Sequence, residues 1–294
     1  MKTEYALLKD VYGYNDARIA EWALLAALDP KLENEVWNLA EPYDPQPPLR
    51  WPSTITAVDR VCKGFYGMTV ISATKGTGKT MLARSSAIEA AASGKWQVVL
   101  FLAEDDYDGW RDGFNIYLNE YEHARECLQY LHVEQVGRNQ TPDSLSLATL
   151  HRIDWSLDRP VLIVIDSINS VVNLSSGSYL HLLKDWGIWC MLARRLSRGR
   201  VSFMLTSEAN RSGNAKGEGL PYWADVHLKM RKLTDRVVEI DLDKTRRTGG
   251  EGPLGKHKRA VGRGRFLTED ELYGERPLRV VGGNEDWDER GEEF

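Results

Sequence analysis

The segment with the clearest chemical content is a glycine-rich run between an apolar stretch and a helical pattern. It reads Ala73-Thr74-Lys75-Gly76-Thr77-Gly78-Lys79-Thr80. Gly76 and Gly78 allow positive φ and let backbone N–H groups approach an anion closely. A helix that begins near Lys79 points the positive end of its dipole toward the same place. These features suit a polyphosphate, with Lys79 supplying charge to the β- and γ-phosphates and the Thr80 hydroxyl available to Mg²⁺.

The residues expected to contact the nucleotide are consecutive: Thr74, Lys75, Gly76, Thr77, Gly78, Lys79, Thr80 and Met81. Phosphate-binding loops of this kind usually begin with Gly, whereas Ala73 stands at that position. A chance glycine-rich turn is the alternative interpretation. The apolar run before the loop and the helical pattern after it favour phosphate binding, with ATP and Mg²⁺ as the expected cofactors.

Two carboxylates follow apolar runs and could complete such a site. Asp166 ends the run 162–166, and a carboxylate beside a phosphate loop can hold the water shell of Mg²⁺. Glu104 follows the run 97–103, where it could polarise an attacking water. The alternative for Glu104 and the two acids after it is that they cap the next helix. We favour Glu104 as the general base.

Beyond residue 50, short apolar runs alternate with helical patterns, as expected of an α/β protein. The predicted strands are 68–73, 97–103, 131–136, 161–166, 201–206, 226–230 and 237–242. The predicted helices are 79–93, 108–126, 142–150 and 179–198. Continuous rather than alternating apolar runs indicate strands buried on both faces. We therefore predict a mainly parallel twisted sheet flanked by helices, with a short helical N-terminal extension.

A proline-rich stretch separates that extension from the core. Residues 42–52 hold five prolines, which favour an extended linker. The predicted divisions are an extension and linker at 1–50, an ATPase domain at 51–268 and an acidic tail at 269–294. Residues 15–28 predict a helix capped by Asn15. This helix could dock on a neighbouring subunit or fold back on its own core, and we favour the neighbour.

Composition limits the class of protein. The 294 residues are 42% hydrophobic with a net charge of −5. The sequence has no stretch of 18 consecutive apolar residues, so it predicts no membrane span. Three widely spaced cysteines and the lack of a secretory pattern predict a cytoplasmic protein. Residues 244–265 carry eight Lys or Arg against one acid, whereas 269–294 carry ten acids against three Arg. The basic segment 256–265 could contact nucleic acid or pair with the acidic tail.

From about residue 53 to 250, the chain resembles the RecA-like ATPases of the DnaB, RadA and KaiC group, and the small hexameric helicases called RepA. The stretches 53–60 and 64–68 look like the lead-in of that group. Proteins of the DnaB type often carry Ala where other phosphate loops have their first Gly, so Ala73 fits the resemblance. The segment Phe101-Leu102-Ala103-Glu104-Asp105 is similar to the one that carries the catalytic Glu, which supports Glu104.

Two further segments carry the resemblance. Leu205-Thr206-Ser207-Glu208-Ala209-Asn210-Arg211 is similar to the sensor strand "L-S-Q-L-N-R", which implies that Ser207 and Glu208 sense the γ-phosphate. Glu208 stands where Gln is usual. Lys244-Thr245-Arg246 resembles the "K-x-R" element, which implies that Lys244 and Arg246 reach the neighbouring subunit's nucleotide. The alternatives are a solvated basic turn and plain contacts with a phosphate backbone.

The resemblance also implies two loops that face single-stranded DNA, at 169–179 and 211–220. Arg211 and Lys216 are the cations of the second loop, and the first loop has none. The alternative is that both are ordinary surface loops.

The resulting hypothesis is an ATP-hydrolysing ring motor on single-stranded DNA, a DnaB- or RepA-like hexameric helicase in the replication of a phage or mobile element. A non-helicase recombination mediator or loader and an ATP-switched oligomeric interaction protein remain as alternatives.

Overall fold

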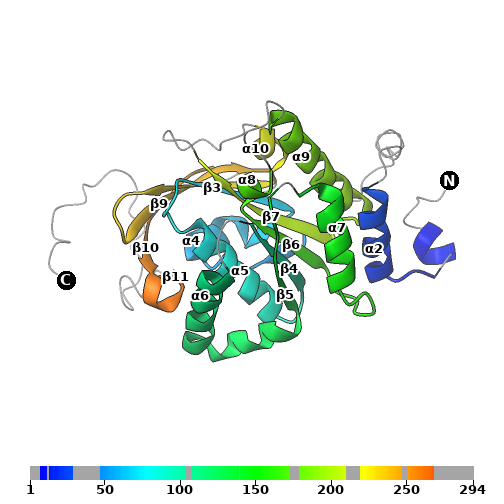
Figure 1. Ribbon diagram of the computed structural model, residues 1–294, viewed down its shortest axis with the longest axis horizontal. Helices are drawn as coiled ribbons and strands as arrows, with labels where there is room; N and C mark the ends of the chain where they lie inside the picture. Colours follow the sequence, from blue (N-terminus) through cyan, green and yellow to red (C-terminus); the bar gives the residue numbers. More distant parts are fainter. Residues whose placement is uncertain are drawn as a thin grey trace.

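The computed structural model describes residues 7–11, 13–28, 47–103, 107–138, 140–172, 179–209, 219–246 and 251–267, without the side chains of 7, 8 and 179–181. A nine-stranded sheet organises this part of the chain, in the order β11-β10-β9-β8-β3-β7-β6-β4-β5 (Figure 1). Its parallel strands are β3 (Met68–Ala73), β4 (Gln97–Leu102), β5 (Leu131–Gln135), β6 (Val161–Asp166), β7 (Val201–Glu208) and β8 (Val226–Lys232).

The parallel strands lie where the apolar runs predict them. Every residue of β3, β4 and β6 is buried, because helices cover both faces of the sheet. The predicted fold class is therefore confirmed. Three antiparallel strands, β9 (Val237–Thr245), β10 (Gly252–Ala260) and β11 (Arg265–Phe266), extend the sheet beyond β8. A separate ribbon pairs β1 (Arg50–Trp51) with β2 (Phe65–Tyr66).

Helices form a layer on each side of the sheet (Figure 1). One layer contains α4 (Thr56–Cys62), α5 (Lys79–Ala92), α6 (Tyr107–Glu120) and the 3-10 helix η2 (Glu122–Gln129). The other contains α2 (Asp16–Ala26), α7 (Pro142–Arg152), α8 (Ile168–Val171), α9 (Tyr179–Leu196) and α10 (Gly219–Trp223). Two short elements complete the set, the π-helix η1 (Leu7–Val11) and the 3-10 helix η3 (Val261–Arg263). No helix among the described residues is long and apolar enough to cross a membrane.

Helix α2 packs against α7 and α9 of its own chain rather than projecting toward a neighbour. Asn15 caps it by accepting a hydrogen bond from the Arg18 backbone N–H at 2.9 Å, as the sequence predicts. Its small inward residues, Ala17, Ala20 and Ala23, are fully buried and allow a close approach. Because this alanine-rich face is already covered, the interpretation that favoured docking on a neighbouring subunit is wrong for α2. Residues 29–46, which include the first part of the predicted linker, lie outside the described residues.

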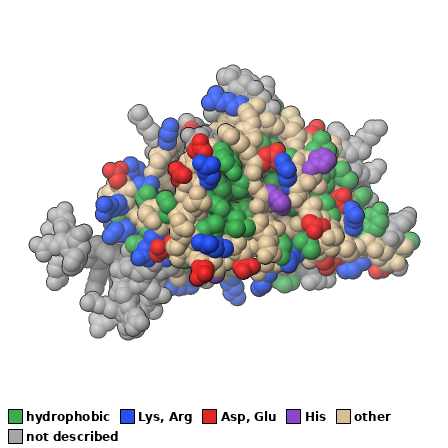
Figure 2. Space-filling model, turned by 60° about the horizontal axis from the view of Figure 1, so that its bottom comes forward, with side chains coloured by type: hydrophobic (Ala, Val, Ile, Leu, Met, Phe, Trp, Pro, Cys, Tyr) green, Lys and Arg blue, Asp and Glu red, His purple; other side chains and the backbone are tan. Residues whose placement is uncertain are grey.

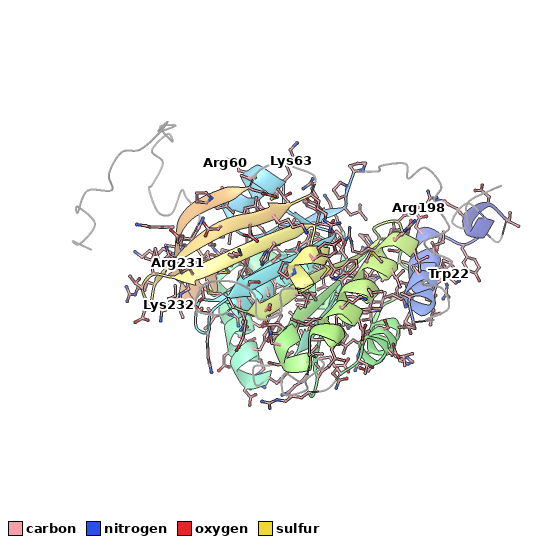
Figure 3. All side chains as sticks on the ribbon, turned by 90° about the horizontal axis from the view of Figure 1, so that it is seen from above. Trp22, Arg60, Lys63, Arg198, Arg231 and Lys232 are labelled. Carbon is pink, nitrogen blue, oxygen red and sulfur yellow. The ribbon has the colours of Figure 1, made fainter. Side chains whose placement is uncertain are left out.

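The surface mixes charges of both signs. Figure 2 shows a strip of hydrophobic side chains on one face, with Lys, Arg, Asp and Glu interspersed around it rather than a continuous basic field. Strands β8 to β11, which are joined by antiparallel pairs, form the antiparallel wing of the sheet. On this wing, Arg231 donates to Glu239, and Lys256 lies opposite Glu239 in the strand register. Figure 3 shows this wing from above, with Arg231 and Lys232 at its outer end.

Gly187 of α9 is the point where α10 docks on the second helical layer. A Cβ placed there would lie 2.3 Å from the indole ring of Trp223. We expect Gly187→Ala to lower the free energy of unfolding by about 1–3 kcal/mol, because the ring must shift from a packed position. Urea denaturation measures the change. Gly137→Ala is the matched control, since its added Cβ would meet only the Gln140 side chain at 3.8 Å. Equal stability of the two variants would contradict the prediction.

Candidate nucleotide-binding site

The loop between β3 and α5 has the conformation that its glycines allow. Gly76 and Gly78 have φ of 75° and 104°, in the left-handed region. The buried Thr77 hydroxyl donates to the Thr74 carbonyl at 2.8 Å, which closes the loop on itself. No side chain caps the first turn of α5. A helix end without a side-chain cap, beside a loop of this conformation, suits an anion.

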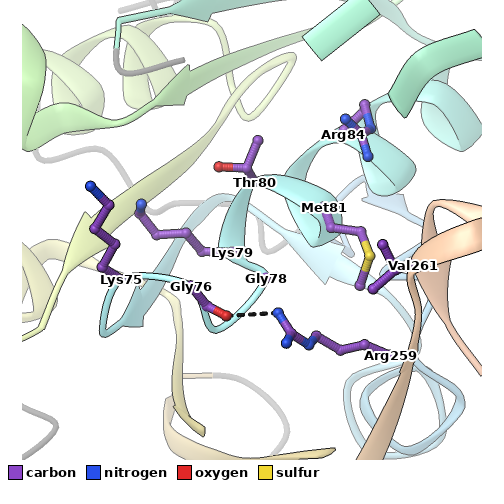
Figure 4. A pocket seen from close by; sticks show the side chains of 9 residues that line it. All are labelled: Lys75, Gly76, Gly78, Lys79, Thr80, Met81, Arg84, Arg259 and Val261. Carbon is purple, nitrogen blue, oxygen red and sulfur yellow. Dashed lines mark hydrogen bonds between the residues drawn. The ribbon is translucent and has the colours of Figure 1, made fainter. Parts of the chain in front are cut away.

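A pocket of about 400 Å³ opens beside this loop (Figure 4). Its lining combines the loop, the first turns of α5, and one residue each of β10 and η3: Lys75, Gly76, Gly78, Lys79, Thr80, Met81, Arg84, Arg259 and Val261. Figure 4 shows Lys75 and Lys79 projecting to the same side of the loop, with the Thr80 side chain beside Lys79. Lys79 is only 6% exposed, so its charge acts in a poorly solvated setting where electrostatic interactions are strong.

The carboxyl ends of the neighbouring strands meet at the same edge of the sheet. Ala73 of β3 pairs with Glu208 of β7, and Leu102 of β4 pairs with Asp166 of β6. Asp166 is 2% exposed and its carboxylate accepts a hydrogen bond from the Thr206 hydroxyl. Carboxylate and hydroxyl oxygens are the ligands that Mg²⁺ prefers, so Asp166 and Thr80 fit that ion chemically.

Asn169 is a site residue that the sequence analysis assigned to a different role. It was expected to begin a DNA-facing loop, but it lies in α8 and is 3% exposed. Its side-chain oxygen accepts the Glu208 backbone N–H at 2.6 Å, which ties the end of β7 to the segment after β6. The nearby Ser207 is also buried, and its hydroxyl donates to the Glu208 carbonyl at 3.4 Å. The expected sensor residues are therefore fixed by hydrogen bonds within the edge that carries Asp166.

Three predicted residues lie outside the described part of the chain: Glu104, Arg211 and Lys216. Glu104 follows Ala103, whose backbone N–H donates to the Asp166 carbonyl at 2.8 Å. The strand that leads to Glu104 therefore ends next to Asp166.

Two solved structures are similar to this arrangement of strands and loop. The ATPase domain of a helicase matches with a TM-score of 0.58 at 14% identity, covering 82% of this chain and 99% of that domain. A KaiC-like protein from the hyperthermophilic archaeon Pyrococcus horikoshii OT3 matches with a TM-score of 0.55 at 19% identity, covering 75% of this chain and 99% of that protein. The chain has a RecA-like ATPase fold of the DnaB and KaiC type. No family model matches the chain, and no curated protein matches its sequence.

In this RecA-like fold, Lys244 and Arg246 lie toward the start of β8, opposite His227 and beside Asp225, whereas Ala73 before the phosphate loop lies opposite Met230. Both contact the carboxyl end of α10, where the Lys244 ammonium donates to the carbonyls of Pro221 and Tyr222 at 2.9 and 2.8 Å. Arg246 donates to the same Tyr222 carbonyl at 2.7 Å. Cations are favoured at a helix carboxyl end because its last carbonyls are unsatisfied. Partial burial, together with the charge of Arg246, lowers the pKa of Lys244.

Arg259 is the pocket residue that sequence reasoning missed. It was part of the basic segment 256–265, expected to meet nucleic acid or the acidic tail, whereas that segment forms β10, η3 and β11. Its guanidinium donates to the Gly76 carbonyl at 2.7 Å and to the Asp235 carbonyl (Figure 4). Arg259 therefore holds the phosphate loop from the far end of the chain. Nothing in the run Lys256–Arg259 indicates a strand, because it contains no apolar residue that could alternate with the charged ones.

Replacing Arg259 tests this contact. We expect Arg259→Ala to weaken binding of a fluorescent ATP analogue by about 3–10-fold, because the loop loses a hydrogen bond that contributes about 0.5–1.5 kcal/mol. Fluorescence titration gives the Kd. Lys258→Ala is the control, since Lys258 is the exposed neighbour on the same strand. A Kd that rises equally in both variants, or in neither, would show that Arg259 does not order the loop.

Proposed function

We propose that the chain is an ATP-hydrolysing subunit of a ring-shaped motor on single-stranded DNA, a DnaB- or RepA-like hexameric helicase serving replication of a phage or mobile element. The observation that carries the proposal is the separation of the phosphate loop from Lys244 and Arg246. Strands β3 and β8 are parallel, with Ala73 at the start of the loop opposite Met230. Lys244 of β9 lies opposite His227, which precedes Met230 by three residues and lies near the start of β8.

That separation amounts to about 10 Å along the strand at about 3.3 Å per residue, which is more than a lysine side chain spans. This separation supports a role for the two cations at a nucleotide other than the one bound to their own loop. A head-to-tail ring of identical subunits brings one edge of a subunit against the opposite edge of the next. Such an assembly would deliver Lys244 and Arg246 to the neighbour's γ-phosphate, where an arginine stabilises the charge of the transferring group.

The chemistry assigned to the rest of the site follows the same proposal. Lys79 and the N–H groups of the loop hold the triphosphate, while Thr80 and Asp166 hold Mg²⁺. When bound, Mg²⁺ neutralises charge on the β- and γ-phosphate oxygens. Glu104 orients and polarises the attacking water. Ser207 and Glu208, on the strand between those of the loop and Asp166, report the state of the γ-phosphate to the DNA-facing loop that carries Arg211 and Lys216.

Three measurements on the native protein test the proposal. We expect ATP hydrolysis to accelerate with single-stranded DNA, the particle size to correspond to a ring in the presence of a non-hydrolysable ATP analogue, and a forked duplex to be unwound. DNA-stimulated hydrolysis without unwinding would replace the helicase by a mediator or loader. Oligomers that depend on ATP but ignore DNA would replace it by an assembly switch. A monomer with no hydrolysis under any condition would overturn the motor itself.

A further inference from the structure

Strand β9 contains one irregular step, directly before Lys244. Val238, Ile240 and Leu242 alternate into the core and lie opposite Lys232, Met230 and Leu228 of β8. The next pair in the ladder joins His227 to Lys244, so the register skips Asp243. Two residues of β9, Asp243 and Lys244, thus stand opposite one residue of β8. This is a β-bulge, which inserts one residue and changes the direction of the side chains that follow.

The bulge decides which face of the sheet receives the two cations. In an uninterrupted strand, Lys244 and Arg246 would follow Leu242 onto the core face, since side chains alternate with a period of two. With Asp243 inserted, Thr245 instead turns inward, where it is 7% exposed and its hydroxyl lies 2.8 Å from that of Tyr66. Lys244 and Arg246 turn to the opposite face, where α10 lies.

A chain of polar contacts fixes the inserted residue. His227 is 1% exposed, and its Nδ1 lies 2.8 Å from an Asp243 carboxylate oxygen while its Nε2 lies 2.8 Å from the Ser72 hydroxyl. Lys229 forms an ion pair with the other Asp243 oxygen at 2.5 Å. Burial lowers the pKa of His227, partly opposed by Asp243, so the ring is neutral at neutral pH. Because a carboxylate only accepts, Nδ1 carries the proton and Nε2 accepts from Ser72.

The order Ser, His, Asp also occurs in hydrolytic triads, but nucleophilic chemistry does not fit here. Ser72 is fully buried within β3, so no substrate can reach its hydroxyl. The arrangement instead connects three adjacent strands. Ser72 directly precedes Ala73 at the start of the phosphate loop, and Asp243 directly precedes Lys244.

We propose that Asp243 and His227 are positioning residues, which hold a one-residue bulge so that Lys244 and Arg246 face outward from the sheet. The catalytic part of this inference rests on the proposed function, in which those cations act on a neighbour's nucleotide. The geometric part stands on the register of β9 alone.

The first test measures the geometry without nucleotide. Cys62, Cys127 and Cys190 are buried, so a charged thiol reagent reports mainly on an introduced cysteine. In the native background we expect Lys244→Cys to react about tenfold or more faster than Thr245→Cys, because burial slows the reaction. Asp243→Ala should narrow or reverse the difference, because a strand that loses the contacts of Asp243 but keeps a residue there can pair regularly and turn Lys244 toward the core. Deleting Asp243 is the control, since it removes the inserted residue itself and so leaves position 244 outward and position 245 inward. An Asp243→Ala variant that keeps the native difference in reaction rate would overturn the proposal.

The second test measures the consequence for hydrolysis. We expect Asp243→Ala to lower kcat by about tenfold or more with KM nearly unchanged, while Asp243→Asn, which still accepts from His227, keeps most of the activity. Asp241→Ala is the matched control on the same face of β9, outside the bulge. The loss should not add to that of Arg246→Ala in the double variant, because both act through one group. Additive losses, or equal losses at 241 and 243, would show that Asp243 does not act through the cations.

The two tests separate the possible failures. If the native protein does not hydrolyse ATP, the proposed function fails while the thiol rates still decide the geometry. If hydrolysis is normal but the thiol order does not depend on Asp243, the positioning role fails and the proposed function stands.

Discussion

Replacing Lys79 with alanine is expected to reduce ATP hydrolysis by about 10²–10³-fold, because the loop loses a preorganised charge at the phosphates. Lys79 is 6% exposed at the first position of α5, so water screens its charge little. Phosphate release measures the rate, and a fluorescent ATP analogue measures binding.

Lys95→Ala provides the matched control, since Lys95 is an exposed lysine that follows the other end of the same helix. Both variants should unfold at the temperature of the native protein, because neither side chain belongs to an apolar core cluster. Hydrolysis that survives in Lys79→Ala would mean that the pocket beside this loop is not where the γ-phosphate is cleaved.

Replacing Arg246 with alanine is expected to lower the DNA-stimulated rate by about 10³–10⁵-fold, the range attributed to an arginine that stabilises phosphoryl transfer. Nucleotide affinity should change little, because Arg246 lies beside Asp225 near the start of β3, whereas the phosphate loop follows the end of that strand. Single-turnover hydrolysis and nucleotide binding distinguish these two effects. Arg231→Ala, on the same antiparallel wing but at its outer end, is the control (Figure 3).

A mixing experiment decides whether Arg246 acts between subunits. A Lys79→Ala subunit still presents Arg246, and an Arg246→Ala subunit still has an intact loop. Combining the two inactive proteins in equal amounts should restore hydrolysis, because about one interface in four then joins an intact loop to an intact arginine if subunits mix at random. No recovery, in assemblies shown to exchange subunits, would place the action of Arg246 within its own chain.

The phosphate loop and the strands around it could be predicted from the sequence because each depends on local pattern. Continuous apolar runs mark strands buried on both faces, and β3, β4 and β6 are such runs. The glycines of the loop are required by backbone conformation, which is also a local property. Asp166 could be proposed because it ends one of these runs.

Other parts of the site depend on contacts between distant segments, which local pattern does not report. Arg259 meets Gly76 across 183 residues, and nothing near Arg259 indicates a partner. The predicted helix 108–126 is divided into α6 and the 3-10 helix η2, with Tyr121 between them. The bulge at Asp243 also escapes prediction, because it depends on pairing with His227. For α2, the sequence indicated the helix and its cap but not the surface that it covers.

The contact between the phosphate loop and the last strands has a consequence for how the protein matures. Gly78 lies so close to β10 and β11 that a Cβ there would be 3.1 Å from Arg259 and 3.4 Å from Phe266. During synthesis from the amino terminus, the loop emerges long before these partners do. A nascent chain that displays the whole loop therefore lacks one wall of its pocket until residues 259–266 have left the ribosome. Competence to hold nucleotide should consequently appear late in translation.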